Sequence, residues 1–202
     1  MCYHYFDMDP RDRILDAAEA TLRRFGTEKT NVVDIARALE MSHANIYRFF
    51  PSKKVLLQAV ADRWLVFLMT PLDAIAADES QPAATRLADW LEKIRSAKRR
   101  KLQDDPEIFR IHFNIITETP EMLGAHLAHL QHQIEKILAD GVASGELASG
   151  MDTTTVARAF LHATEPFYHP GLIMHAAPTK ADAEAVLGLL LDGLRKRSRR
   201  QV

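Results

Sequence analysis

The 202-residue chain contains little cysteine, glycine or proline, and each shortage excludes a class of protein. Its single cysteine, Cys2, excludes an intrachain disulfide framework and a cysteine-based zinc module. The eight glycines and nine prolines fall mostly between periodic segments, whereas good helix formers are abundant. No run alternates with the period of a β-strand, so the predicted fold class is all-α.

Two further features that the sequence lacks bear on where the protein is located in the cell. No stretch approaches the roughly 20 uninterrupted apolar residues of a membrane span. The first nine residues carry aromatic and acidic side chains, which is unlike a signal peptide. Since 47% of the residues are hydrophobic, the chain can build a core. We therefore expect a cytoplasmic globular protein without a membrane partner.

The motifs of common enzymes are also missing. The chain has no glycine-rich phosphate loop, no Gly-x-Ser-x-Gly elbow and no His-Glu-x-x-His pair. The neighbouring Asp104 and Asp105 form no catalytic constellation with the scattered histidines. We expect no enzymatic activity and no cofactor. The net charge of −1 gives no general attraction to nucleic acid, although such an average is compatible with a local basic surface.

Apolar periodicity predicts about nine helices. In the first of them, Ile14, Leu15, Ala18, Leu22 and Phe25 share one face, and Gly26 comes next, where a residue with positive φ is favoured. Asn31, Ser42 and Ser52 are predicted N-caps, and Pro51 ends the third helix. The predicted ranges are 11–25, 31–39, 42–50, 53–70, 82–102, 106–119, 120–144, 153–168 and 179–196.

Residues 30–53, TNVVDIARALEMSHANIYRFFPSK, carry the functional prediction. Two short helices are separated by the turn at residues 39–42, which is typical of a helix-turn-helix. The predicted inward side chains are those of Val32, Ile35, Ala36 and Leu39 on the first helix, and Ile46 with Phe49 or Phe50 on the second. The outward face of the second helix then holds His43, Ala44, Asn45, Tyr47 and Arg48.

These outward residue types suit the major groove of DNA. Asparagine bonds adenine, histidine and arginine donate to guanine, and alanine contacts a thymine methyl group. Because the start of a recognition helix reaches bases first, His43, Ala44 and Asn45 are predicted base readers. Tyr47 and Arg48 are expected to contact phosphates or flanking positions. Further predicted DNA contacts, mainly with phosphates, lie at the helix starts: Thr30, Asn31, Ser42, Ser52 and Lys53.

This segment resembles the DNA-binding domain of the tetracycline-repressor (TetR/AcrR) family. Upstream, Ile14, Ala17, Ala18, Phe25 and Gly26 also fit the family's first helix, so the resemblance spans about residues 11–70. Glu40 departs from the pattern, because the family usually has glycine in the turn. The matching residues are Thr30, Val32, Asp34, Ile35, Ala36, Ser42, Ile46, Tyr47, Phe50, Ser52 and Lys53.

The resemblance implies an N-terminal three-helix DNA-binding domain at residues 1–52 and a helical ligand-binding and dimerisation domain at 53–202, with 53–70 as a connecting strut. It implies a homodimeric transcriptional regulator that represses until a small-molecule effector releases it from a palindromic operator in double-stranded DNA. The last two helices would form the dimer interface. The residues assigned to that interface are Ala183, Val186, Leu187, Leu190, Leu191 and Leu194.

The effector is expected among the middle helices, where large aromatic residues favour an apolar or aromatic molecule. The candidate pocket residues are Trp64, Phe67, Trp90, Phe109, His112, Phe113, Ile116, His162, Phe167 and Tyr168. Each of them is also an ordinary core residue by its type. The family resemblance identifies no particular ligand.

Three alternatives remain open from the residues alone. The first is a helical adaptor without a DNA role. The second is a metal-responsive regulator, since His126, His129 and His132 recur every three residues and His162 and His169 share a face. A solvated helix face explains these histidines more simply, so no metal site is assigned. The third is DNA contact by two basic runs, residues 98–101 and 195–200, which we interpret instead as a solvated helix end and a tail.

Overall fold

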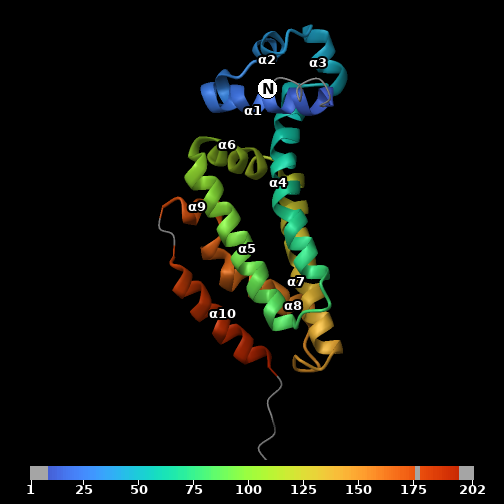
Figure 1. Cartoon of the computed structure of the whole chain (residues 1–202), viewed down its shortest axis with the longest axis vertical. Helices are drawn as coiled ribbons and strands as arrows, with labels where there is room; N and C mark the ends of the chain where they lie inside the picture. Colours follow the sequence, from blue (N-terminus) through green and yellow to red (C-terminus); the bar gives the residue numbers. More distant parts are fainter. Residues whose placement is uncertain (1–8, 176–177, 196–202) are drawn as a thin grey trace, which may run out of the picture. The chain divides into compact units, whose positions relative to one another are not determined.

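The computed structural model describes residues 9–175 and 178–195 of the chain. It is all-α, as predicted, and the isolated pairing of Leu147 with Arg195 is the one β-type contact in the described ranges (Figure 1). Cys2 and the basic residues from Lys196 onward lie outside those ranges. The helices are α1 Pro10–Lys29, α2 Val32–Ala38, α3 His43–Phe49, α4 Lys53–Ala77, α5 Ala83–Asp104, α6 Pro106–Thr117, α7 Pro120–Ala143, α8 Thr153–Thr164, the 3₁₀ turn η1 Glu165–Phe167, α9 Pro170–Ile173 and α10 Lys180–Leu194.

The predicted helix starts are confirmed at the level of single hydrogen bonds. The side-chain oxygen of Asn31 accepts from the Val33 amide at 3.1 Å. The hydroxyl oxygens of Ser42 and Ser52 each accept, at 3.2 Å, from the amide three residues later. Each bond satisfies an amide that has no partner within its helix, which is why these residue types indicate helix starts in the sequence.

Prolines produce the main differences from the predicted helices. The predicted helix 153–168 ends at Thr164, and Pro166 and Pro170 divide the next nine residues of the chain into η1 and α9. In contrast, α4 continues through Pro71 to Ala77, beyond its predicted end at residue 70. By its length and composition α4 could cross a membrane, although it contains no uninterrupted run of roughly 20 apolar residues. Buried helices of globular proteins share that property, so it does not decide location.

The chain forms two compact units that differ from the sequence-based division. Within the described residues, the N-terminal unit comprises residues 9–66 and 105–120, and the C-terminal unit comprises residues 67–104, 121–175 and 178–195. The helix α6 therefore belongs with the N-terminal unit, and α4 contributes residues to both. Packing between segments far apart in sequence creates this grouping, and periodicity carries no information about it.

Apolar side chains of α1 belong to the core of the N-terminal unit. Ile14, Leu15, Ala18 and Leu22 are buried as predicted, whereas Phe25 is exposed and lies under the guanidinium of Arg24, at 4.9 Å from the ring centre. Gly26 has φ +73°, so Phe25 comes just before a break in the helix and leaves the buried face.

Ion pairs connect α1 to its neighbours in the N-terminal unit. The guanidinium of Arg63 on α4 contacts the carboxylates of Asp16 at 2.7 Å and Glu19 at 3.1 Å. Arg23 donates to Asp105 at the start of α6. These partly exposed pairs fix orientation more than they add stability.

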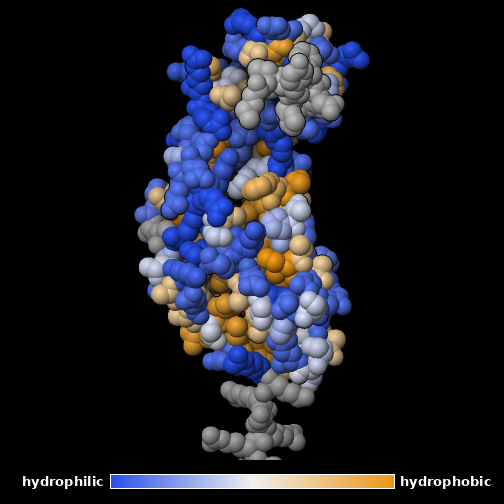
Figure 2. Space-filling view, viewed as in Figure 1, coloured by the Kyte–Doolittle hydropathy of each residue, from blue (hydrophilic) through white to orange (hydrophobic). Residues whose placement is uncertain are grey.

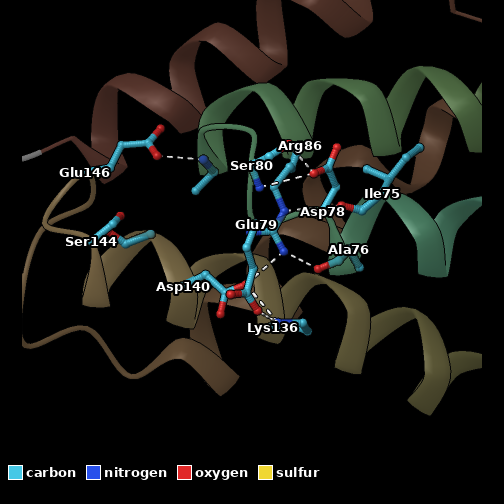
Figure 3. A network of polar contacts seen from close by, with 12 residues as sticks. Ile75, Ala76, Asp78, Glu79, Ser80, Arg86, Lys136, Asp140, Ser144 and Glu146 are labelled. Carbon is cyan, nitrogen blue, oxygen red and sulfur yellow. Dashed lines mark hydrogen bonds and ion pairs between the residues drawn. The ribbon is translucent and has the colours of Figure 1, made fainter.

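The core of the C-terminal unit draws on residues 68–76 of α4 and on α5, α7, α8, η1 and α10, and the Trp90 side chain within it is fully buried. A polar network secures one end of α5 (Figure 3). The buried Arg86 donates to the carbonyls of Ile75 and Ala76 and to Asp140. The carboxylate of Glu146 accepts from the first two amides of α5, at 2.6 and 2.9 Å.

We predict that Gly141→Ala destabilises the protein. A Cβ at Gly141 on α7 would lie 2.7 Å from both the Ala83 Cβ and a Leu147 methyl carbon. Overpacking of this kind lowers the free energy of unfolding by about 1–3 kcal/mol. Gly124, on the same helix, has open space around it. Gly124→Ala is the matched control and should raise that free energy by about 0.5–1 kcal/mol through helix propensity. Denaturant titration of both variants checks this, and equal effects would contradict the packing at Gly141.

Candidate nucleic-acid interface

The two helices of the motif are held by a small set of buried side chains. Val32, Ile35 and Ala36 of α2 are buried, and Ile46 of α3 is fully buried. The structure decides between the two phenylalanines: Phe50 points inward and Phe49 is exposed. The guanidinium of Arg11 lies 5.2 Å from the centre of the Phe50 ring, which ties the beginning of α1 to the end of α3.

The turn between α2 and α3 has the hydrogen bonds of a Schellman motif. The Met41 amide donates to the Ala36 carbonyl at 3.0 Å, and the Glu40 amide donates to the Arg37 carbonyl at 3.2 Å. This arrangement requires a left-handed residue after the helix, and Glu40 has φ +53°. No other non-glycine residue in the described part of the chain has a positive φ. Glu40 therefore occupies a position that favours glycine, which is where the sequence departs from the family pattern.

The solvent face of α3 carries the predicted base-reading residues. His43, Ala44, Tyr47 and Arg48 are exposed, and Asn45 is half-buried. The rings of His43 and Tyr47, one turn apart, meet edge to face with centres 4.6 Å apart. The motif thus presents an aromatic pair, an amide and a guanidinium on one short helix.

Besides the capping residues Asn31, Ser42 and Ser52, the predicted phosphate ligands Thr30 and Lys53 also have partners in the structure. Thr30 is only 2% exposed, and its hydroxyl donates to the Gly26 carbonyl at 2.7 Å. A phosphate contact by this side chain is excluded in this conformation. The Lys53 ammonium donates to the Thr27 carbonyl at 2.8 Å. That bond leaves two of its three N–H groups for an anion and fixes Lys53 beside the end of α1.

We predict that Glu40→Gly stabilises the protein, because a left-handed conformation costs a residue with a Cβ about 1 kcal/mol. Glu40→Ala retains the Cβ and keeps that cost, so it is the control for loss of the carboxylate. Thermal unfolding should place the glycine variant above the alanine variant. The opposite order would contradict strain at this turn.

The predicted effector-pocket residues belong to two different units. Trp64, Phe109, His112, Phe113 and Ile116 belong to the N-terminal unit, where the Trp64 and His112 rings stack with centres 6.1 Å apart. The other five belong to the C-terminal unit: Phe67, Trp90, His162, Phe167 and Tyr168.

The five in the C-terminal unit differ in burial. Trp90, Phe167 and Tyr168 are core residues, and the Trp90 and Tyr168 rings meet edge to face with centres 5.9 Å apart. Phe67 is 69% exposed and His162 lies on the surface of α8, so neither is part of that core.

Lys98 is the polar residue that the sequence-based interpretation misses. The basic run at residues 98–101 predicts a solvated helix end, but Lys98 is only 6% exposed. The spacing of the residues in the sequence could have indicated this burial. Lys98 lies four residues after Ile94 and seven after Leu91, on the buried face of α5. Gln133 is also absent from the predicted sites; it is buried and accepts from the Trp90 indole N–H at 2.8 Å.

The predicted dimer residues on α10 face mainly the core of their own chain. Ala183 and Leu194 are buried, and Val186, Leu187, Leu190 and Leu191 pack partly against the core. Leu189, which is outside the predicted set, is 76% exposed. In Figure 2, hydrophobic and hydrophilic residues are interspersed over the face of the C-terminal unit that is in view.

Acidic, histidine and cysteine side chains form no cluster of three that could hold a metal ion within residues 9–175 and 178–195. Of the three periodic histidines, His129 pairs with Asp73 at 2.7 Å and His132 is exposed. This arrangement fits the solvated-face interpretation for His129 and His132, whereas His126 is half-buried.

A helix-turn-helix unit and a larger helical unit in one chain are the arrangement of a class of DNA-binding transcriptional regulators. Two family profiles match this chain: "Bacterial regulatory proteins, tetR family" over residues 14–60, and "Tetracyclin repressor-like, C-terminal domain" over residues 83–187. The chain belongs to the TetR family. Members of this family are DNA-binding transcriptional regulators and not enzymes.

Individual relatives agree with this assignment. The HTH-type transcriptional regulator RutR of Escherichia coli O157:H7 is 30% identical over 139 residues, which are 67% of this chain and 63% of RutR. The structure of SmeT, the repressor of the Stenotrophomonas maltophilia multidrug efflux pump SmeDEF, has 23% identity over 95% of this chain and 93% of its own, with a TM-score of 0.69.

A structure of FadR from Bacillus subtilis in complex with stearoyl-CoA has 20% identity over 91% of this chain and 99% of its own, with a TM-score of 0.62. A second structure of SmeT, in complex with triclosan, has 22% identity over 93% and 92% and a TM-score of 0.68. At these identities the structural likeness establishes the fold.

Proposed function

We propose that this chain is a homodimeric repressor that binds a palindromic operator through α3 and is released by a small, largely apolar effector. The observation that carries the proposal is the exposed face of α3, where His43, Ala44 and Arg48 stand on a helix fixed by a Schellman turn and a serine cap. A rigid helix with these residue types fits the major groove. Residues 1–52 would bind DNA, residues 53–202 would bind effector and partner, and the protein would act in the cytoplasm.

The proposed mechanism is a shift between two states of the dimer. A two-fold operator requires the two recognition helices to lie roughly 34–36 Å apart, which is one turn of DNA. Effector binding would move the helix at residues 53–70 and change this separation. A coupling free energy of about 1–3 kcal/mol between the two sites is sufficient for regulation.

The operator is best found by selecting high-affinity fragments from genomic DNA, including the region upstream of the protein's own gene. The proposal predicts fragments that bind far more tightly than unrelated duplex at the same salt concentration. Binding of no fragment at low salt, by a dimer that is folded, would overturn the proposal.

We predict different effects for two substitutions on α3. Asn45→Ala removes a base contact and should lower the ratio of specific to non-specific affinity by roughly 10–100-fold. Arg48→Ala removes a phosphate contact, so it should weaken both affinities alike and flatten the salt dependence. Fluorescence anisotropy over a salt series measures both quantities. Arg110→Ala, an exposed arginine paired with Glu107 on α6, is the control and should change neither. Equal loss of specificity in the first two variants would contradict these roles.

For the dimer, we predict that Leu189→Glu dissociates the protein into monomers. Leu189 is the most exposed large apolar residue of α10, and a charge in a buried interface without a partner is strongly destabilising. Leu127→Glu, at an exposed leucine on α7, should leave the dimer intact. Sedimentation velocity distinguishes these outcomes. A dimer that persists in the Leu189 variant, or a monomeric wild-type protein, would exclude α10 as the interface.

A further inference from the structure

The core of the C-terminal unit contains a lysine ammonium with no counter-ion at contact distance. Lys98 is buried on α5, and its Nζ lies 5.4 Å from the centre of the Tyr168 ring. Among the described residues, no hydrogen bond and no ion pair reaches this ammonium. Burial lowers the pKa of Lys98 to about 8, against the opposing charge of Glu165, so the side chain is still mostly cationic at neutral pH. The Glu165 carboxylate itself is half-exposed and lies 3.8 Å from His169.

A histidine on α7 is the second group left without a partner. The Nδ1 of His126 is buried and has no hydrogen-bond partner in the described chain. Burial and the nearby charges of Lys98 and His129 lower the pKa of His126 to about 3. The ring is therefore neutral, with one donor nitrogen and one acceptor nitrogen. Lys98 on α5 and His126 on α7 thus each have unused hydrogen-bonding capacity, and the charge of Lys98 acts on the His126 ring.

Several other polar side chains of the C-terminal unit do have partners. The Trp90 indole donates to Gln133 at 2.8 Å, Gln133 donates to Asp73 at 2.6 Å, and Asp73 also contacts His129 at 2.7 Å. The Tyr168 hydroxyl donates to the Leu161 carbonyl at 3.2 Å, and burial raises the pKa of this phenol so that it stays protonated. Folded proteins satisfy nearly all buried polar groups, so a buried polar side chain without a protein partner is a candidate for binding a polar group of a ligand.

We infer that Lys98 and His126 form the anion-binding end of the effector site and that the effector carries a carboxylate on an apolar body. A single carboxylate matches the one ammonium and supplies two acceptor oxygens, of which the second can take an N–H from His126. The apolar part of the molecule would contact the hydrophobic core of the C-terminal unit, to which the Tyr168 ring beside the ammonium belongs. This inference rests on the proposed function as an effector-responsive regulator and specifies the class of effector.

The test uses two small probes that differ mainly in charge. Benzoate carries the carboxylate, and benzyl alcohol has the same ring without it. For the full-length protein, about 10 mM benzoate should raise the melting temperature and the neutral alcohol should have a smaller effect. The Lys98→Met variant should lose the benzoate effect, and His126→Phe should reduce it. Lys93→Met, at a lysine of the same helix that is not buried, should respond as the wild type does.

The unliganded variant gives a second, independent readout. If Lys98 is held in the core for a ligand, replacing it with methionine removes the cost of burying a charge, and the melting temperature without probe should rise. A lysine with a structural role would give the opposite result. The inference is overturned by a lower melting temperature of unliganded Lys98→Met, by equal effects of the two probes, by no benzoate effect, or by a benzoate effect that persists in Lys98→Met.

DNA binding of the same samples separates this inference from the proposed function. Lys98→Met should bind the selected genomic fragments as tightly as the wild type, and benzoate should weaken DNA binding only in proteins that retain Lys98. Loss of DNA binding in every sample would refute the proposed function. Intact DNA binding without any response to the carboxylate would refute the present inference alone.

Discussion

Helices of seven residues form too few backbone hydrogen bonds to be stable alone, and the DNA-binding surface depends on two of them. The packing of Ile35 and Ile46 in the core of the N-terminal unit supplies the stability that α2 and α3 lack. The Schellman bonds around Glu40 and the cap at Ser42 then fix the angle between the helices. Because one face of α3 is buried in this core, the opposite face points to solvent. The packing that stabilises α3 therefore also determines which of its residues form the recognition surface.

Two buried cations of the C-terminal unit, Arg86 and Lys98, have different surroundings. Arg86 is buried, but two carbonyls and the Asp140 carboxylate satisfy its guanidinium, and the network secures the beginning of α5. Lys98, further along the same helix, is also buried, and its ammonium lies 5.4 Å from the centre of the Tyr168 ring. The guanidinium of Arg86 therefore has a structural role. The ammonium of Lys98 has no carboxylate partner among the described residues and is available to bind an anion.

The sequence predicts the features that depend on local chemistry. Caps, the inward positions Val32, Ile35 and Ala36 of α2 and the unusual position of Glu40 depend on spacing and residue type, and the structure confirms them. Leu39, which is also predicted to point inward, is half-buried. Features set by tertiary packing are not predictable in this way. The run of four basic residues starting at Lys98 is typical of a solvated helix end, and only the path of α5 through the core buries the first of them. Thr30 likewise matches the family pattern while its hydroxyl bonds the Gly26 carbonyl.

The central claim is that two copies of α3 read a symmetric DNA site. Hydroxyl-radical footprinting of the wild-type protein on its tightest genomic fragment tests this most directly. The account predicts two protected, inverted half-sites whose centres lie about 34–36 Å apart on the same face of the duplex. A protected segment without two-fold symmetry, or no protection under conditions in which the protein is a folded dimer, would contradict it.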